Sequence, residues 1–397
     1  MSESRHPFAF THHRLRRESL IAHRRLYGTI LLLCVIVVAW PFVRAGLQAL
    51  AVLDRVADSA VPLPVAWIAS GPVTTSEMML PLPSGAVRAR LYTPVHHAHA
   101  PAIMIIHGVQ YLGIDEPRLV AFASAMSSCG LRVLTPELPD IKDYHVGAHS
   151  IESIGDAAVW LAHQNGDRPV GVMGLSFSGS LSLMAAAEPQ YRPDIKFVVA
   201  AGSEAEMSRV ANYYITGKDP RPDGSVEVLP PHEYGALVLE YTNLQDFVLA
   251  PDLDAVRRVL REHLYEDVSA ERAALGKLTP TQAAEAKLLM DTTSPITRRK
   301  LAESNALHRG AMASVSPQGH LAQLTAQVYL LHGEADNVIP SAETLWLERE
   351  IPRKDLKAGL ISPVISHLDL NDKGPTFEDQ WRLVCFFAKI LRAAESR

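Results

Sequence analysis

MGLSFSGS, residues Met173 to Ser180, follows the apolar run VGVM (170–173) and leads into the helix-like stretch SLSLMAAAE (180–188). A buried strand that runs straight into Gly-x-Ser-x-Ser-Gly and then into a helix is typical of a sharp strand-to-helix turn, which holds one serine hydroxyl at the end of a sheet. Gly174, Ser178 and Gly179 keep both sides of Ser176 small, as a chain that bends back on itself requires. An ordinary glycine-rich turn has a similar local sequence, so the rest of the chain has to decide between the two.

Two later segments each place a polar residue just after a strand. QVYLLHGEADNVIP (327–340) contains the buried run Val328 to Leu331, and Asp336 follows it in a loop. LKAGLISPVISHLDL (356–370) is a second strand-like run, and its loop carries His367. A serine, an acid and a histidine, each placed after a strand, are the residue types that nucleophilic catalysis by a serine requires. Glu334, two residues before Asp336, is the alternative acid.

These motifs resemble those of the α/β-hydrolase superfamily, in the style of its serine esterase and dienelactone-hydrolase-like branches. The order Ser176, Asp336, His367 is the order of that superfamily. Ser178 departs from the pattern, because most members carry glycine there. The segment HGVQ (107–110) is a second difference, since many lipases and esterases have HGGG at this place. The resemblance covers roughly residues 74–394, apart from an insertion, and rests on four motifs: His107-Gly108-Val109, Gly174-Leu175-Ser176-Phe177-Ser178-Gly179, Gly333-Glu334-Ala335-Asp336 and Ser366-His367.

The resemblance implies an oxyanion hole and a mechanism. In this architecture, the loop after an early strand and the residue after the nucleophile each lend one backbone N–H, here those of Val109 and Phe177. His107 is expected to brace its loop by hydrogen bonding and to take no part in catalysis. Ser176 would attack a carbonyl carbon and form an acyl-enzyme, with His367 as general base and Asp336 orienting it. Neither a cofactor nor a metal is implied.

The remaining sequence fits a mostly parallel sheet covered by helices on both faces. Between residue 203 and about residue 321 the alternation of strands and helices stops, which predicts an inserted helical cap. Helices are predicted there at 252–265, after the N-cap Thr279 and after Ser294. Five aromatic residues of this cap are either walls of a pocket or, as we favour for each, part of the cap's own core: Tyr213, Tyr214, Tyr234, Tyr241 and Phe247. Outside the cap, strands are predicted within 76–95, 101–106, 131–139 and 197–201, and helices at 115–129, at 151–164 and from Thr376 onward, the last with Trp381, Val384, Cys385, Ala388 and Leu391 on its apolar face.

The N-terminal region carries a different signal. GTILLLCVIVVAWPFV (28–43) is continuously apolar and follows an arginine-rich leader. Sixteen helical residues span about 24 Å, and AGLQALAVL extends the run toward the roughly 30 Å of a bilayer core. The arginine bias predicts a signal anchor with its N-terminus in the cytoplasm and the hydrolase domain across the membrane. A cleaved signal peptide, with Ala49-Leu50-Ala51 as its site and a secreted product, is the alternative.

Composition limits the remaining classes of function. The net charge is −5 and no long basic run lies outside the leader, so nucleic-acid binding is not expected. Three cysteines cannot form a disulfide framework, although a Cys129–Cys385 bridge stays open. The partners predicted are a small ester or acyl substrate and the membrane. Thioester or amide hydrolysis, acyl transfer, a peptidase of the same fold, and a non-catalytic membrane-anchored binding module are the alternatives to ester hydrolysis.

The chain is therefore divided into six parts, whose bounds follow from these patterns: leader 1–27, anchor 28–53, linker 54–73, core 74–202, cap 203–321 and core 322–397.

Overall fold

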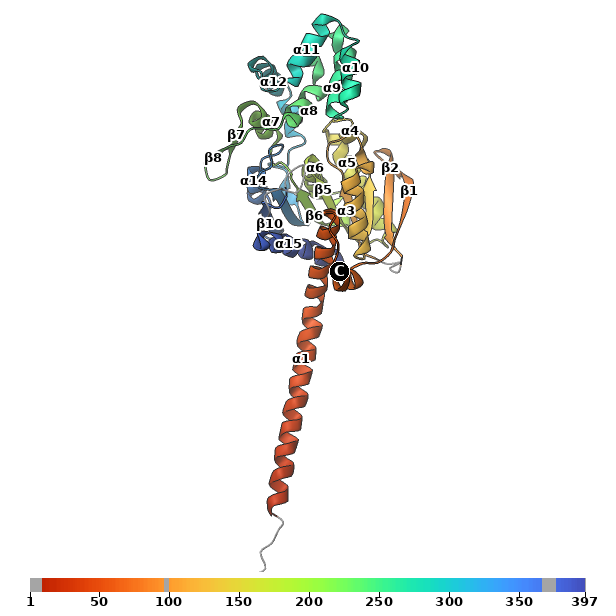
Figure 1. Ribbon diagram of the computed structural model, residues 1–397, viewed down its shortest axis with the longest axis vertical. Coiled ribbons are helices and arrows are strands. Elements are labelled where there is room, and N and C mark those ends of the chain that lie inside the picture. Colours follow the sequence, from red (N-terminus) through yellow and green to blue (C-terminus); the bar gives the residue numbers. More distant parts are fainter. Residues whose placement is uncertain (1–8, 96–99, 366–375, 397) are drawn as a thin grey trace, which may run out of the picture.

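A mixed sheet of eight strands forms the centre of the domain (Figure 1). The computed structural model describes residues 9–95, 100–365 and 376–396. From one edge of the sheet to the other the strands are β1 (Val73–Leu82), β2 (Gly85–Pro94), β4 (Arg132–Pro136), β3 (Ala102–Ile106), β5 (Val170–Leu175), β6 (Ile195–Ala201), β9 (Gln327–Gly333) and β10 (Leu356–Ser362).

The six strands from β4 to β10 run parallel, and β2 pairs antiparallel with both β1 and β4. All five residues of β3 are buried, as expected for a parallel strand covered on both faces. The mostly parallel sheet of the predicted α/β-hydrolase architecture is confirmed, and the structure adds that its antiparallel hairpin, β1 with β2, lies at one edge.

Helices cover both faces of the sheet. The end of α1 (Ala9–Val56) packs with α3 (Pro117–Ser128) and α15 (Phe377–Glu395) over one face. On the other face lie α5 (Ala148–Gln164), α6 (Phe177–Ala187) and α14 (Ala342–Glu350), while α4 (Pro139–Lys142) follows β4. The prediction for α15 was wrong at one position, because Trp381 is exposed, whereas Val384 and Leu391 are buried with Phe386, Phe387 and Ile390.

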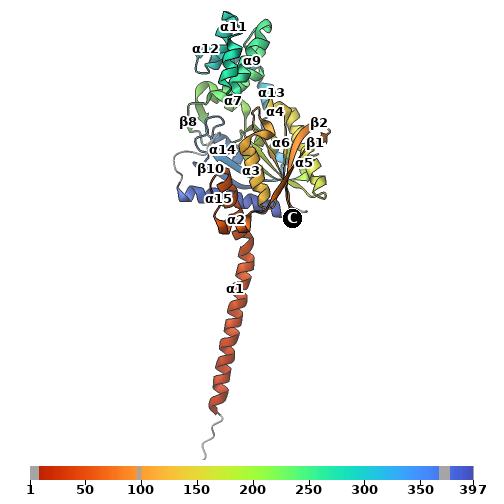
Figure 2. The same cartoon turned by 45° about the vertical axis from the view of Figure 1, so that its right-hand side comes forward.

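The insertion after β6 is helical, and it lies at the opposite end of the molecule from the free part of α1 (Figures 1 and 2). Its helices are α7 (Met207–Thr216), α8 (Glu233–Thr242), α9 (Leu253–Leu264), α10 (Val268–Leu275), α11 (Pro280–Met290), α12 (Pro295–Leu307) and α13 (Arg309–Ala313). The predicted N-caps of α11 and α12 are present, since Thr279 and Ser294 accept hydrogen bonds from backbone amides. The sequence pattern missed the short hairpin of β7 (Lys218–Pro220) and β8 (Val226–Val228).

The N-terminal helix is one continuous element of 48 residues with two different environments. Its side chains are exposed from Ile30 to Val38, while Ala45, Ala49 and Val52 are buried against the domain. Among the described residues, one helix is long and apolar enough to cross a membrane, and it is this one. The boundary falls at Arg44, so residues 45–53, which the sequence pattern joined to the span, belong to the packed domain. The stretch expected to be a linker contains a further helix, α2 (Leu63–Ala69).

Candidate active site

Ser176 stands at the turn between β5 and α6 with a left-handed backbone conformation, φ 56° and ψ −137°. Its N–H donates to the carbonyl of Ala201 (2.7 Å), and its own carbonyl accepts from Gly179 N–H (2.9 Å) and from Ser203 Oγ (2.8 Å). A non-glycine residue in this region costs about 1–3 kcal/mol, and such strain persists where the surroundings over-determine it. The hydrogen bonds on both sides of Ser176 supply that constraint.

The small residues around Ser176 are required by close backbone contacts. A Cβ atom on Gly174 would lie 2.2 Å from the carbonyl oxygen of Ser178, and one on Gly179 would lie 2.0 Å from Ser203 Oγ. Neither space can be opened by moving the end of a long side chain. The glycines of MGLSFSGS therefore form the predicted sharp turn, which distinguishes it from an ordinary glycine-rich loop.

His107 is buried and uses both ring nitrogens to hold the loop after β3. Its Nδ1–H donates to the carbonyl of Gly108 (2.8 Å), and its Nε2 accepts from Leu138 N–H (3.0 Å). Burial lowers the pKa of this histidine, which favours the neutral ring that these contacts require. The predicted bracing contacts are confirmed.

These contacts also orient the amide of Val109. The carbonyl of Gly108 and the N–H of Val109 belong to one trans peptide plane, so they point in opposite directions. When His107 holds the carbonyl, the Val109 N–H is turned away from His107. A Cβ on Gly108 would lie 3.5 Å from Ser176 Cβ, so this peptide passes directly beside the serine. Within the described part of the chain, neither Val109 N–H nor Phe177 N–H donates a hydrogen bond.

Ser178, the departure from the family pattern, has a role in this arrangement. Its Oγ donates to the carbonyl of His107 (2.6 Å) and thereby ties the start of α6 to the loop after β3. A glycine at this position would lack that bond. Tyr234 of α8 donates to the carbonyl of Val109 from the other side, so the loop is held by both the core and the cap.

Asp336 follows β9 and is buried, with its carboxylate held in a fixed orientation. Its Oδ1 accepts from the N–H groups of Val338 and Ile339, each at 2.9 Å, and its Oδ2 lies 3.4 Å from Nε2 of His332. His332 is itself bound to Ile339 O (2.8 Å) and to Thr344 Oγ1 (2.7 Å). Glu334, the alternative acid, is exposed.

His367 lies outside the described residues, which end on that side at Ile365. The strand that leads to it, β10, pairs in parallel with β9, and Ser362 is opposite Gly333. The N–H of Glu334 donates to the carbonyl of Ser362 (3.0 Å), so the chain runs toward His367 from the same sheet edge that carries Asp336.

Two residues that the sequence analysis did not single out contact the turn at Ser176 and the helix that follows it. Ser203 binds the Ser176 carbonyl, and Glu204 follows it with a fully buried carboxyl group whose pKa burial raises well above the usual value. The carbonyl of Glu204 accepts from Ser180 Oγ (2.7 Å). The available signal was the polar run GSEAE directly after β6, since polar residues at the carboxyl end of a parallel strand lie where ligands bind in such sheets.

The aromatic residues of the cap pack into a hydrophobic cluster that the cap shares with the core domain, so the favoured interpretation, a separate core of the cap, was wrong. Tyr213, Tyr214, Tyr241 and Phe247 are buried, and Tyr234 contacts the Val109 carbonyl. Burial raises the pKa values of Tyr213 and Tyr214, which keeps both hydroxyls neutral.

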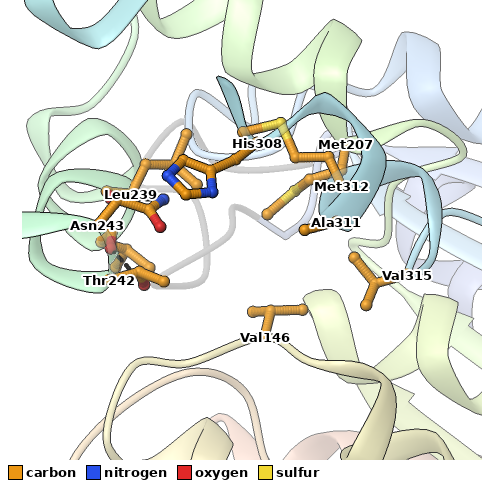
Figure 3. A pocket seen from close by; sticks show the side chains of 10 residues that line it. Val146, Met207, Leu239, Thr242, Asn243, His308, Ala311, Met312 and Val315 are labelled. Atoms are coloured by element: carbon orange, nitrogen blue, oxygen red, sulfur yellow. Dashed lines mark hydrogen bonds between the residues drawn. The ribbon is translucent and has the colours of Figure 1, made fainter. Parts of the chain in front are cut away.

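A small cavity of about 70 Å³ lies where the cap meets the core (Figure 3). Val146 of the core faces Met207, Met312 and Val315 across it, which gives largely apolar walls. His308, paired with Asp246 at 2.8 Å, stands at one side with Thr242 and Asn243. Ser176 and Asp336 are not among its lining residues in the described part of the chain.

No metal-binding or disulfide cluster accompanies this site in the described ranges. No group of three or more His, Cys, Asp or Glu is placed there to hold a metal ion. Cys129 and Cys385 are both free, and burial raises the pKa of the Cys129 thiol to about 11.

The comparisons with known proteins give fold neighbours at low identity. No family model matches this sequence, and no curated protein matches it. An esterase from Pyrobaculum calidifontis is 16% identical over 89% of this chain and 93% of its own, with a TM-score of 0.45. Dipeptidyl peptidase 4 from Porphyromonas gingivalis is 14% identical over 81% of this chain and 35% of its own, with a TM-score of 0.45.

A third structure, the 2,6-dihydroxy-pseudo-oxynicotine hydrolase, is 13% identical over 83% of this chain and 71% of its own, with a TM-score of 0.43. The chain spans about a third of the length of the peptidases among these structures. The structures are named as hydrolases of several substrate classes. The fold of this chain is therefore assigned from its own strand order and strand directions.

Proposed function

We propose that this protein is a serine hydrolase that cleaves carboxylic esters through Ser176, His367 and Asp336. The strained backbone of Ser176, with two amides beside it that donate to no described residue, is the observation that carries the proposal. A purely structural turn does not need a serine with a positive φ angle. At a nucleophile, the same conformation presents the serine hydroxyl at the end of the sheet.

The proposed reaction proceeds in two balanced halves. Ser176 Oγ attacks the ester carbonyl carbon while His367 accepts its proton, and the oxyanion forms next to the amides of Val109 and Phe177. Collapse of the intermediate breaks the carbon–oxygen bond of the ester, and His367 returns the proton to the leaving alcohol. Water then attacks the acyl-enzyme in the same way, which releases the acid and restores Ser176.

The supporting residues have separate tasks in this proposal. Asp336, oriented by the amides of Val338 and Ile339, holds His367 in the productive tautomer and stabilises its cation. His107 aims the Val109 amide by holding the other end of its peptide. Removing one such donor costs a comparable enzyme about 3–4 kcal/mol.

Membrane anchoring by α1 belongs to the same proposal, with the N-terminus in the cytoplasm. The alternative cleavage site, Ala49-Leu50-Ala51, lies in the part of α1 that packs into the domain, where Ala49 and Ala51 are buried. Cleavage there would remove Ala45 and Gln48, and Gln48 donates to the carbonyl of Cys129 (2.5 Å). The mass of the mature protein extracted from membranes tests this, since an uncleaved anchor retains residues 1–51.

Labelling with a fluorophosphonate probe tests the hydrolase. We expect the intact protein to be labelled and Ser176→Ala to be silent, with Ser269→Ala, at an exposed serine of the cap, as a matched control that retains labelling. A soluble form has to start no later than Arg44, because residues 45–56 fill part of the core. A folded wild-type protein that neither reacts with the probe nor hydrolyses short-chain aryl esters would favour the non-catalytic module.

A further inference from the structure

The domain follows the apolar part of α1 without a linker. Phe42 and Val43 are exposed, Ala45 is buried, and Arg44 between them pairs with Glu395 of α15 at 3.5 Å. One helix thus passes from the proposed span directly into the core. The underside of the domain has to lie within a few residues of the bilayer surface wherever α1 crosses it.

A stripe of residues on α15 runs from this junction to two exposed aromatic side chains near the start of the helix. The guanidinium of Arg392 lies 3.7 Å from the centre of the Phe42 ring, and Trp381 and Phe377 lie about three to four turns further along α15. Residues 377, 381, 385, 388 and 392 are spaced by three or four, so they share one face of the helix. Phe377 is 80% exposed and Trp381 56%, and their rings stack with centroids 6.4 Å apart.

The orientation of α15 keeps this stripe at one level. In both views α15 runs crosswise to α1 beneath the sheet, close to where α1 leaves the domain (Figures 1 and 2). If α1 spans a bilayer, α15 therefore lies along its surface. Arg382 and Lys389 are exposed on the same helix, together with the acidic Glu378.

The short helix α2 adds a second apolar pair at the same level. Leu63 and Trp67 are 86% and 88% exposed, and their spacing of four places them on one face. α2 lies beside α1 at the base of the domain in both views (Figures 1 and 2). Large apolar side chains are normally exposed singly, so two such pairs beside a candidate span require an explanation.

We propose that Leu63, Trp67, Phe377 and Trp381 form a membrane-contact surface that sits in the headgroup region of the bilayer crossed by α1. Tryptophan favours this zone because its ring is apolar while its N–H can still bond to water or to lipid oxygens. Arg382, Lys389 and Arg392 are placed to meet lipid phosphates. This inference rests on the proposed anchoring and is independent of the hydrolase chemistry.

The contact surface also orients the domain relative to the bilayer. α1 and the end of α15 pack near the amino ends of the strands, where Lys196 at the start of β6 donates to Ala394 O (2.6 Å). Ser176 and Asp336 lie at the carboxyl ends, about 20 Å away for strands of six residues. A domain seated on this surface presents its cap to the aqueous phase, because the cap lies at the opposite end of the molecule from α1 (Figures 1 and 2).

Quenching of single tryptophans by brominated lipids in vesicles tests the proposal on the full chain. The protein has five tryptophans, at positions 40, 67, 160, 346 and 381, so four variants keep one of Trp40, Trp67, Trp381 and Trp346 with the others as phenylalanine. We expect Trp67 and Trp381 to be quenched at least twofold more than Trp346, whose Nε1–H donates to Pro220 O of the cap hairpin (2.8 Å). Trp40, within the apolar part of α1, is the positive control.

If Trp40 is quenched but Trp67 and Trp381 are quenched no more than Trp346, the contact surface is overturned and the anchor is retained. The same result with blue-shifted emission from Trp67 and Trp381 assigns the patch to contact between copies of this chain. Absence of Trp40 quenching overturns the anchor and the surface together. Thermal unfolding of each variant confirms that it is folded, and fluorophosphonate labelling, read separately, reports on the proposed hydrolase.

Discussion

Ser176 lies at the edge of the sheet that the carboxyl ends of the parallel strands form. This edge and the helical cap above it are held in place in different ways. At the edge, backbone groups and small residues fix the chain, as in the bond from Ser176 N–H to Ala201 O. Among the described residues, the cap has one backbone bond to the core, from His232 N–H to Asn337 O (2.8 Å), together with side-chain ties such as Arg209 of α7 on Glu343 of α14 and Tyr234 on the Val109 carbonyl. The edge should therefore fail through steric clashes or lost catalytic groups, and the cap through lost charges.

The largest effect is expected at the acid. Asp336→Asn keeps an oxygen for the amides of Val338 and Ile339, so the fold should survive. It cannot stabilise a histidine cation, and we expect kcat/KM for a soluble ester to fall about 10⁴-fold. Glu334→Gln, at the exposed alternative acid, should leave the rate unchanged. If steady-state kinetics show a loss of activity in Glu334→Gln and none in Asp336→Asn, Glu334 is the acid that orients the histidine.

The difference between local backbone constraints and tertiary side-chain contacts also explains how much of the structure the sequence could predict. The strands of the parallel sheet are continuous apolar runs, and the turn at Ser176 needs glycine at fixed positions, so local patterns suffice there. The caps of α11 and α12 were likewise found because an N-cap is a local interaction. Where a helix packs through tertiary contacts, the pattern failed: Trp381 fits the apolar periodicity of α15 and yet is exposed, and α1 changes surroundings within an unbroken apolar run.

The next largest effect tests the sterics of the edge against those of the cap. Gly174→Ala places a Cβ 2.2 Å from Ser178 O and 2.4 Å from Gly179 N, and both are backbone atoms. We expect a loss of about 4 kcal/mol in the free energy of unfolding, measured by urea denaturation. Gly310→Ala in α13 of the cap meets nothing within 4 Å and should be neutral or stabilising by up to about 1 kcal/mol. Equal effects at the two glycines would contradict the comparison.

Breaking the tie between cap and core should cost somewhat less. Glu343 is buried, binds Arg209 at 2.5 Å and 2.9 Å, and accepts from the amides of Ala205 and Glu206. Glu343→Ala leaves the Arg209 charge without its partner, and we expect a loss of about 3 kcal/mol by the same denaturation.

Two controls separate this buried pair from ordinary surface charge. Glu227→Ala removes the partner of Arg221 on the cap hairpin, where both side chains are 36% exposed, and should cost less than about 1 kcal/mol. The double variant Arg209→Met with Glu343→Met should recover part of the loss, because it removes both charges. No recovery would indicate that the two amides, and not the ion pair, depend on Glu343.

The smallest effect is a pH dependence of the cap. Asp219 on β7 is buried, and burial together with the nearby carboxylates of Glu343 and Glu227 raises its pKa to about 7. The folded state then holds its proton more tightly than the unfolded chain, whose aspartate has its ordinary value of 3.8. Any contribution of this group to stability is thus fully present below about pH 4 and is lost as the pH rises toward 7, with a slope of at most about 1.4 kcal/mol per pH unit.

Asp219→Asn removes that slope, because the amide resembles the protonated acid and does not ionise. We expect the variant to match the wild type near pH 4 and to exceed it by about 2 kcal/mol at pH 8, since water entering the cap would reduce the full effect of the shift. Asp223→Asn on the same hairpin is the control: its carboxylate accepts from Ser225, which lowers its pKa, so this variant should lose a little stability at neutral pH. Parallel unfolding curves for Asp219→Asn and the wild type from pH 4 to pH 8 would mean that the hairpin opens to solvent, and the cap would then be held by Arg209 and Tyr234 without a buried acid beneath it.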